Sequence, residues 1–195
     1  MLYHIDSSGS CNSIANNYPK YIFYENELEK SGMKKLLLMR HAKSSWDDSD
    51  IPDQMRPIKK KGRKDAERMG KLLKSKKLEP DLILSSTALR AKETAEIVAE
   101  TCKCKKEIVF LDSLYMAEPS DILHAIEKNA KDKKTIMIVG HNPGLEAFLQ
   151  IANGKVESLP TASIAYLTAS IDQWSELGKG DNVKLKKLWR PKDLK

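Results

Sequence analysis

From Lys35 onward, short apolar runs alternate with longer stretches in which apolar residues recur on one helical face. The apolar runs, which are typical of strands, are "KLLLM", "DLILSS", "EIVFL" and "TIMIVG". The helical patterns between and after them cover residues 59–76, 88–102, 120–128 and 143–152. In the first of these, Ala66, Met69 and Leu73 recur at three- and four-residue steps, opposite lysines and acids. This alternation predicts an α/β fold: a three-layer α/β/α sandwich with a mostly parallel central sheet.

Two more strand-like stretches, "SIAYLTA" and "VKLKKLW", follow the last helical pattern. The second alternates apolar residues with lysine, which is typical of an edge strand because charge discourages further pairing. Prolines mark two helix boundaries. The residue before Pro80 avoids helical dihedral angles, so the first helix ends before it, and Asn142 followed by Pro143 is a helix start signal.

Residues 1–32 have a different composition from the rest of the chain, being rich in Asn, Ser and Tyr without a clear period. They are not Arg-rich and acid-poor, as a transit peptide would be. We predict an N-terminal extension over residues 1–32 and one domain over residues 33–195. The alternative is that the chain begins at Met33, which stands directly before the first strand.

Composition places the protein among ordinary globular proteins, with 41% hydrophobic and 31% charged residues. The odd cysteine count (Cys11, Cys102 and Cys104) fits a reducing compartment, so we expect a cytoplasmic protein. The two cysteines of the C-x-C pair have no partner ligands for zinc. No apolar run approaches the ~20 residues of a membrane span, and there is no signal-peptide pattern, so we expect no membrane association.

The net charge of +7 raises the question of anionic partners. Most of it comes from lysines interspersed with acids, which is typical of a solvated helix face. Only 6% of the residues are aromatic, which offers few platforms for stacking nucleic-acid bases. We therefore expect no nucleic-acid partner, and we expect a monomer.

Arginine and histidine follow three of the predicted strands. "LLLM" is followed by Arg40 and His41, "LILSS" leads through Thr87 to Arg90, and "IMIVG" is followed by His141. Each occurrence alone has an ordinary explanation, as a surface pair, a helix-surface charge or a turn. However, the carboxyl ends of parallel strands meet at one edge of a sheet, where ligands bind. Their coincidence there predicts a common site.

Two guanidinium groups and two imidazoles suit phosphoryl transfer. The planar fork of arginine binds phosphate oxygens in a bidentate way, and positioning of charge is most of the catalytic work in this chemistry. Imidazole can act as a nucleophile and form a covalent phosphoenzyme. A metal site is disfavoured because only two histidines are placed at this edge and Arg40 would repel a cation. We expect neither a metal nor another cofactor.

The chain resembles the histidine phosphatase superfamily, which includes cofactor-dependent phosphoglycerate mutases, and within it the small SixA-type phosphohistidine phosphatases. The resemblance rests on "LLLMRHAKSSWDD", "RPIKKKGRKDAERMG", "LILSSTALRAKETAEIVAE", "LDSLYMAEPSDILHAI" and "IMIVGHNPGLEAFL", in the family's order. It implies that His41 is the phosphate-accepting nucleophile and that Arg40, Arg90 and His141 surround the phosphoryl oxygens. Ala42 stands where glycine is commoner in the superfamily, as expected of SixA-type members.

The resemblance implies a metal-independent phosphatase with a phosphohistidine enzyme intermediate. Its expected substrate is a phosphohistidine-bearing protein such as a phosphorelay domain. Glu118 is the nearest candidate for a general acid, but before Pro119 at a helix start it also suits the helix dipole. Phosphohistidine needs little help from an acid because imidazole is a far better leaving group than an alkoxide. The alternatives are a phosphomonoesterase for small phosphate esters or phosphoserine and phosphothreonine, and a non-catalytic phosphoprotein-binding module.

Other residues near these motifs have two interpretations each. Trp46 either contributes to a rim against the substrate or packs inside the domain. Arg56 either reaches the phosphate pocket or packs near the following helix. His141 is expected to be protonated next to a bound phosphate, whereas His41 must be neutral to attack. His124 is predicted to be exposed.

Overall fold

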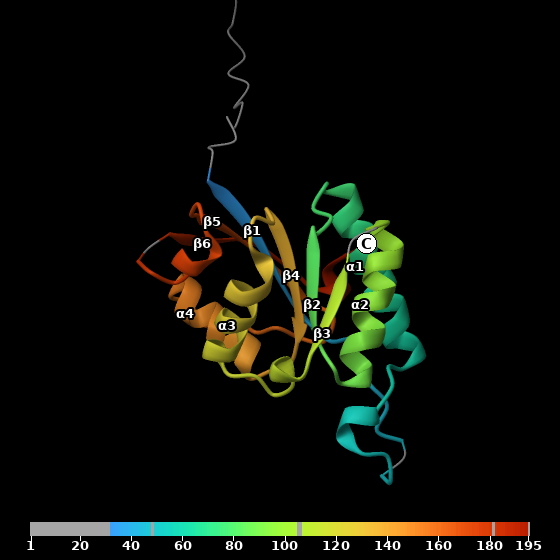
Figure 1. The fold of residues 1–195 in the computed structure, drawn as a ribbon. Helices are drawn as coiled ribbons and strands as arrows, with labels where there is room; N and C mark the ends of the chain where they lie inside the picture. Colours follow the sequence, from blue (N-terminus) through green and yellow to red (C-terminus); the bar gives the residue numbers. More distant parts are fainter. Residues whose placement is uncertain (1–31, 48, 105–106, 181, 195) are drawn as a thin grey trace, which may run out of the picture. The chain divides into compact units, whose positions relative to one another are not determined.

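A six-stranded sheet forms the centre of the domain that the structure describes (Figure 1). The computed structural model describes residues 32–47, 49–104, 107–180 and 182–194. The predicted N-terminal extension lies outside the described residues apart from Gly32, and so does Cys11. The strands are β1 (Met33–Arg40), β2 (Leu82–Ser86), β3 (Ile108–Leu111), β4 (Thr135–Gly140), β5 (Ile164–Ser170) and β6 (Val183–Trp189).

The strand order is β3-β2-β4-β1-β5-β6. The first four strands of this order are parallel to one another, whereas β5 pairs antiparallel with both β1 and β6. The prediction of a mostly parallel sheet is confirmed, and β6 is an edge strand, as its alternating lysines indicate. Because β1 and β4 are parallel neighbours with Arg40 opposite Gly140, the residues that follow them emerge side by side.

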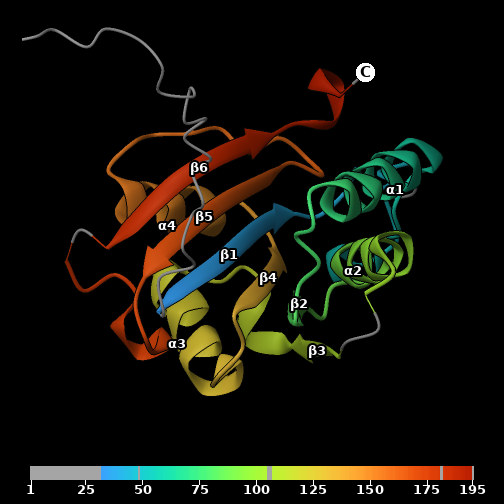
Figure 2. The same ribbon diagram turned by 90° about the horizontal axis from the view of Figure 1, so that it is seen from above.

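The helices form a layer on each face of the sheet, which confirms the three-layer architecture (Figure 2). Helices α1 (Lys60–Ser75) and α2 (Leu89–Cys102) pack on one face, and α3 (Pro119–Ala130) and α4 (Gly144–Asn153) on the other. Alternate β1 residues supply the two cores, Leu36 and Leu38 on the α3/α4 side and Leu37 and Met39 on the α1/α2 side. All four are fully buried. Burial of each side chain stabilises the fold by about 1.5–3 kcal/mol.

The helix bounds agree with the periodicity to within two residues. The start of α4 differs slightly, because Pro143 occupies the N-cap position and the helix begins at Gly144. A Cβ on Gly144 would overlap the carbonyl oxygen of Ala117, so glycine lets the loop before α3 approach this helix start. Among the described helices, none has the length and apolar character needed to cross a membrane.

Candidate active site

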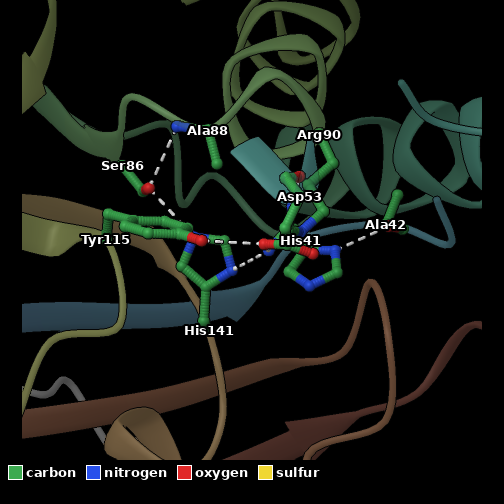
Figure 3. Close-up of polar contacts among 8 residues, drawn as sticks. All are labelled: His41, Ala42, Asp53, Ser86, Ala88, Arg90, Tyr115 and His141. Carbon is green, nitrogen blue, oxygen red and sulfur yellow. Dashed lines mark hydrogen bonds and ion pairs between the residues drawn. The ribbon is translucent and has the colours of Figure 1, made fainter. Parts of the chain in front are cut away.

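The structure brings the four predicted site residues together at the carboxyl ends of β1, β2 and β4. His41 follows β1 and His141 follows β4, and their ring centroids are 5.0 Å apart. Arg90 lies in the first turn of α2, with its Nη2 atom 3.4 Å from Nδ1 of His141. Arg40 is the last residue of β1, and its charge acts on both histidines. Figure 3 shows His41, His141 and Arg90 around a common centre.

His41 is held in one tautomer by the backbone. Its Nδ1 atom lies 2.8 Å from the carbonyl oxygen of Ala42. A carbonyl oxygen can only accept a hydrogen bond, so Nδ1 carries the proton and Nε2 keeps its lone pair. Burial, followed by the positive charges of Arg90 and Arg40, lowers the pKa of His41 to about 4. The ring is therefore neutral at neutral pH and available as a nucleophile.

Thr94 connects the nucleophile to α2. The backbone N–H of Ala42 donates to Oγ1 of Thr94 at 2.9 Å, and this hydroxyl donates to the carbonyl oxygen of Arg90 at 2.6 Å. Thr94 is fully buried. The chain segment that orients His41 is thus fixed to the turn that carries Arg90. Thr94 was not predicted from the sequence, although its spacing of four residues from Arg90 places both on one side of α2.

His141 is also oriented by hydrogen bonds. Its Nε2 atom is 2.9 Å from Oγ of Ser86, and that oxygen also accepts the backbone N–H of Ala88 at 3.2 Å. Because the guanidinium of Arg90 can only donate, Nδ1 of His141 is the acceptor and Nε2 carries the proton.

Burial, with the repulsion from His41 once that ring is protonated and the charge of Arg90, lowers the pKa of His141 to about 3. Surrounded by protein groups alone, His141 is therefore neutral at neutral pH. The protonated form expected from the sequence requires the negative charge of a phosphoryl group beside the ring.

Asp53 and Tyr115 complete the site, and neither was predicted from the sequence. Asp53 begins the short 3-10 helix η1 (Asp53–Met55). Its Oδ2 atom accepts hydrogen bonds from Nη2 of Arg90 at 2.8 Å and from the Tyr115 hydroxyl at 2.9 Å. Its backbone oxygen accepts from Nη1 of Arg90 at 2.5 Å. Burial opposes ionisation of Asp53, but the two hydrogen bonds and the charge of Arg90 outweigh it and lower its pKa.

Arg40 is fixed from the other side of the site. Its Nη1 atom donates to the carbonyl oxygen of Leu159 at 3.0 Å, and the N–H of Leu159 donates to Glu146 at 2.7 Å. The Nε atom of Arg40 is buried and has no hydrogen-bond partner in the part of the chain that the structure describes. This N–H is available to an anion in the site, since a buried donor without an acceptor is unfavourable.

Glu118 lies at the start of α3, where it forms a capping box with Asp121. Its exposed position and this structural role fit the helix-start interpretation. Trp46 does not pack inside the domain: it is 67% exposed, and the guanidinium carbon of Arg56 lies 4.3 Å from its ring centroid. His124 is exposed, as predicted.

The described residues contain no group of three or more histidine, cysteine or acidic side chains that could hold a metal ion. Burial raises the pKa of the Cys102 thiol to about 11, which disfavours the thiolate form that binds metals. The groups that do converge are two guanidinium groups and two neutral imidazoles, one with a free nitrogen lone pair. Such a set can bind a tetrahedral anion and attack its central atom.

Comparison with known proteins agrees with the family resemblance seen in the sequence. A model of the family described as the histidine phosphatase superfamily (branch 1) matches residues 36–114. An uncharacterized chloroplastic protein from Arabidopsis thaliana is 34% identical over 152 residues, which cover 73% of this chain and 70% of the relative.

Two solved structures share the fold. A candidate phosphohistidine phosphatase SixA from Agrobacterium tumefaciens has a TM-score of 0.70 and 28% identity, covering 81% of this chain and 98% of its own. The protein histidine phosphatase SixA complexed with tungstate also has a TM-score of 0.70, with 21% identity and coverage of 83% and 99%.

Proposed function

The chain belongs to the histidine phosphatase superfamily, and from this premise we propose that it is a metal-independent phosphatase that hydrolyses phosphohistidine on proteins. The observation that carries the proposal is the state of His41: a neutral, buried imidazole with its Nε2 lone pair free, next to Arg90 and His141. A protein that only binds phosphate has no need of such a nucleophile. The non-catalytic alternative is therefore not favoured.

In the first step, Nε2 of His41 attacks phosphorus while the bond from phosphorus to the leaving nitrogen breaks. Arg40, Arg90 and His141 stabilise the charge on the phosphoryl oxygens. Nδ1 of His41 keeps its proton throughout, because this N–H donates a hydrogen bond to the carbonyl oxygen of Ala42. The phosphorylated ring is therefore a cation.

In the second step, water attacks the phosphorylated His41 and inorganic phosphate is released. The electron pair of the broken bond returns to Nε2. Since the proton on Nδ1 is retained, the imidazole leaves in its neutral form and needs no proton from elsewhere. The enzyme returns to its starting state.

The surroundings of the site support a protein substrate. Three large apolar side chains are exposed on the connections that also carry Asp53 and Tyr115: Trp46 at 67%, Met55 at 59% and Met116 at 57%. We call them the apolar rim. Met55 lies in η1 with Asp53, Met116 follows Tyr115, and the Trp46 ring contacts Arg56 beside Met55. Exposed apolar groups that border a polar site are typical of protein–protein contact.

Trapping of the phosphoenzyme tests the proposal. The protein is mixed with a radiolabelled phosphohistidine protein and quenched, and the label on the enzyme is measured. We expect an acid-labile, alkali-stable label that is absent from His41→Ala, while His124→Ala, at an exposed histidine, retains it. Turnover of phosphoserine peptides or sugar phosphates in preference to phosphohistidine would instead favour the phosphomonoesterase. Label retained in His41→Ala would refute the assignment of the nucleophile.

A further inference from the structure

We propose that Asp53 selects phosphohistidine by accepting a hydrogen bond from the ring N–H of the imidazole leaving group. This inference rests on the proposed function. It assigns a specificity-determining role to a carboxylate that also contacts Arg90 and Tyr115 (Figure 3).

Asp53 lies at the outer edge of the site. Its side chain is 39% exposed, whereas that of Arg90 is 7% exposed and His41 and His141 are buried. The phosphoryl group must reach Nε2 of His41, in the buried part. The leaving imidazole stays attached to a protein and so must remain on the open side, where Asp53 lies.

The charge of Asp53 reaches both histidines of the site. Its negative charge raises the pKa of His41 and of His141, against the larger effect of burial, which lowers both. Other acids near the site are engaged elsewhere: Glu146 accepts the N–H of Leu159, and Glu93 accepts the N–H of Ile58. Asp53 is thus the described carboxylate best placed to act on a substrate.

One oxygen of Asp53 is available for a further donor. Within the described residues, the side-chain hydrogen bonds from Arg90 and Tyr115 both end at Oδ2. The hydrogen bonds from Arg90 and Tyr115 and the charge of Arg90 outweigh burial and favour the ionised form of the carboxylate. An ionised carboxylate cannot give a proton to an alkoxide, but it readily accepts a hydrogen bond from an N–H.

The chemistry of the leaving group needs such an acceptor. When the bond from Nε2 of His41 to phosphorus forms and the bond from phosphorus to the substrate nitrogen breaks, the electron pair stays on that nitrogen. If the substrate ring already carries a proton on its other nitrogen, imidazole leaves as a neutral molecule. A carboxylate beside that N–H stabilises the protonated ring. Asp53 would then keep the proton on the far nitrogen of the substrate ring, as the carbonyl oxygen of Ala42 keeps the proton on Nδ1 of His41.

The same carboxylate disfavours phosphate esters. An ester oxygen has no N–H to offer, and it gains negative charge as it leaves, next to the negative charge of Asp53. Replacing the carboxylate by an amide should therefore affect the two substrate classes differently. In Asp53→Asn, the remaining oxygen would stay with the donors of Arg90 and Tyr115, so that the NH2 group faces the N–H of the substrate.

The test compares kcat/KM of Asp53→Asn and the unaltered protein for a phosphohistidine peptide and for p-nitrophenyl phosphate. We expect the ratio of phosphohistidine to p-nitrophenyl phosphate activity to fall by about tenfold or more. Asp47→Asn is the matched control, because Asp47 carries the same charge in the same connection and pairs with Lys59 instead. Its ratio should not change.

Each result is decisive. An equal loss on both substrates would mean that Asp53 only positions Arg90. Unchanged activity on both substrates would remove any role of Asp53. Either result overturns the inference. Asp53→Ser, which removes the charge without adding an amide, gives the same comparison if the asparagine variant does not fold. Failure of the unaltered protein to hydrolyse phosphohistidine would instead refute the proposed function, whatever the variants do.

Discussion

Nδ1 of His41 lies 2.8 Å from the carbonyl oxygen of the next residue, Ala42. This contact between neighbours fixes which nitrogen of the ring is free. It depends in turn on Thr94, 52 residues further along the chain, because the N–H of Ala42 donates to the Thr94 hydroxyl. The tautomer of the proposed nucleophile is therefore controlled from α2, the same helix that presents Arg90.

Replacement of Thr94 by valine tests this connection. Valine has nearly the same shape but no hydroxyl, so the buried N–H of Ala42 would lose its acceptor. We expect this loss to lower the free energy of unfolding by about 1–3 kcal/mol. We expect kcat to fall by about 10- to 100-fold as His41 loses its orientation. Steady-state kinetics and urea unfolding measure the two effects.

Thr94→Ser is the matched control, since it keeps the hydroxyl and loses only a methyl group. It should retain most of kcat. If the valine variant loses stability but keeps kcat, Thr94 contributes to packing and not to the orientation of His41.

Arg90 should not tolerate lysine. Its Nη1 and Nη2 atoms both contact Asp53, and Nη2 also lies near His141, which a single ammonium group cannot reproduce. We expect Arg90→Lys to lower kcat/KM by about 100-fold or more. This is the size of effect seen when an enzyme loses one hydrogen-bond donor that stabilises charge in the transition state.

Arg68→Lys is the control for Arg90→Lys. Arg68 lies on α1 and donates to the carbonyl oxygen of Pro191, outside the site. An equal loss in both variants would show that the effect is a general one of arginine replacement.

The parts of the site that could be predicted from the sequence are those fixed by strand order. His41 and His141 directly follow the strands β1 and β4, and parallel neighbours place such residues side by side. Asp53 could not be predicted in this way, because it lies in a connection without periodicity. Its contact with Tyr115 joins residues 62 positions apart and depends on how two loops fold toward each other.

The apolar rim should matter for protein substrates more than for small ones. Met116→Gln and Met55→Gln remove exposed apolar surface from two of its members. We expect KM for a phosphohistidine protein to rise by about tenfold in the double variant, because about 1.4 kcal/mol of contact energy is lost. The change for p-nitrophenyl phosphate should be smaller.

Ile151→Gln is the control for the rim. Ile151 is 71% exposed on α4 and is not a member of the rim. The same increase in KM with Ile151→Gln, or equal effects on both substrates, would contradict a role for the rim in docking.

Acid should destabilise the protein through its two site histidines. Their pKa values are about 4 for His41 and about 3 for His141 in the folded protein, against about 6.5 in an unfolded chain. Between these values the unfolded state binds more protons than the folded state, so the free energy of unfolding decreases as pH falls below about 6.5. At pH 5 each histidine accounts for on the order of 2 kcal/mol of the loss relative to pH 7.

Urea unfolding at pH 7 and pH 5 measures this effect. Carboxylates contribute to the same change, so the comparison is with His141→Gln, which should lose less stability between the two pH values than the unaltered protein. His124→Gln replaces an exposed histidine and should behave like the unaltered protein. If His141→Gln shows the full acid-induced loss, His141 is not held neutral by burial and by the charge of Arg90. Its proposed change of protonation on phosphate binding would then no longer follow.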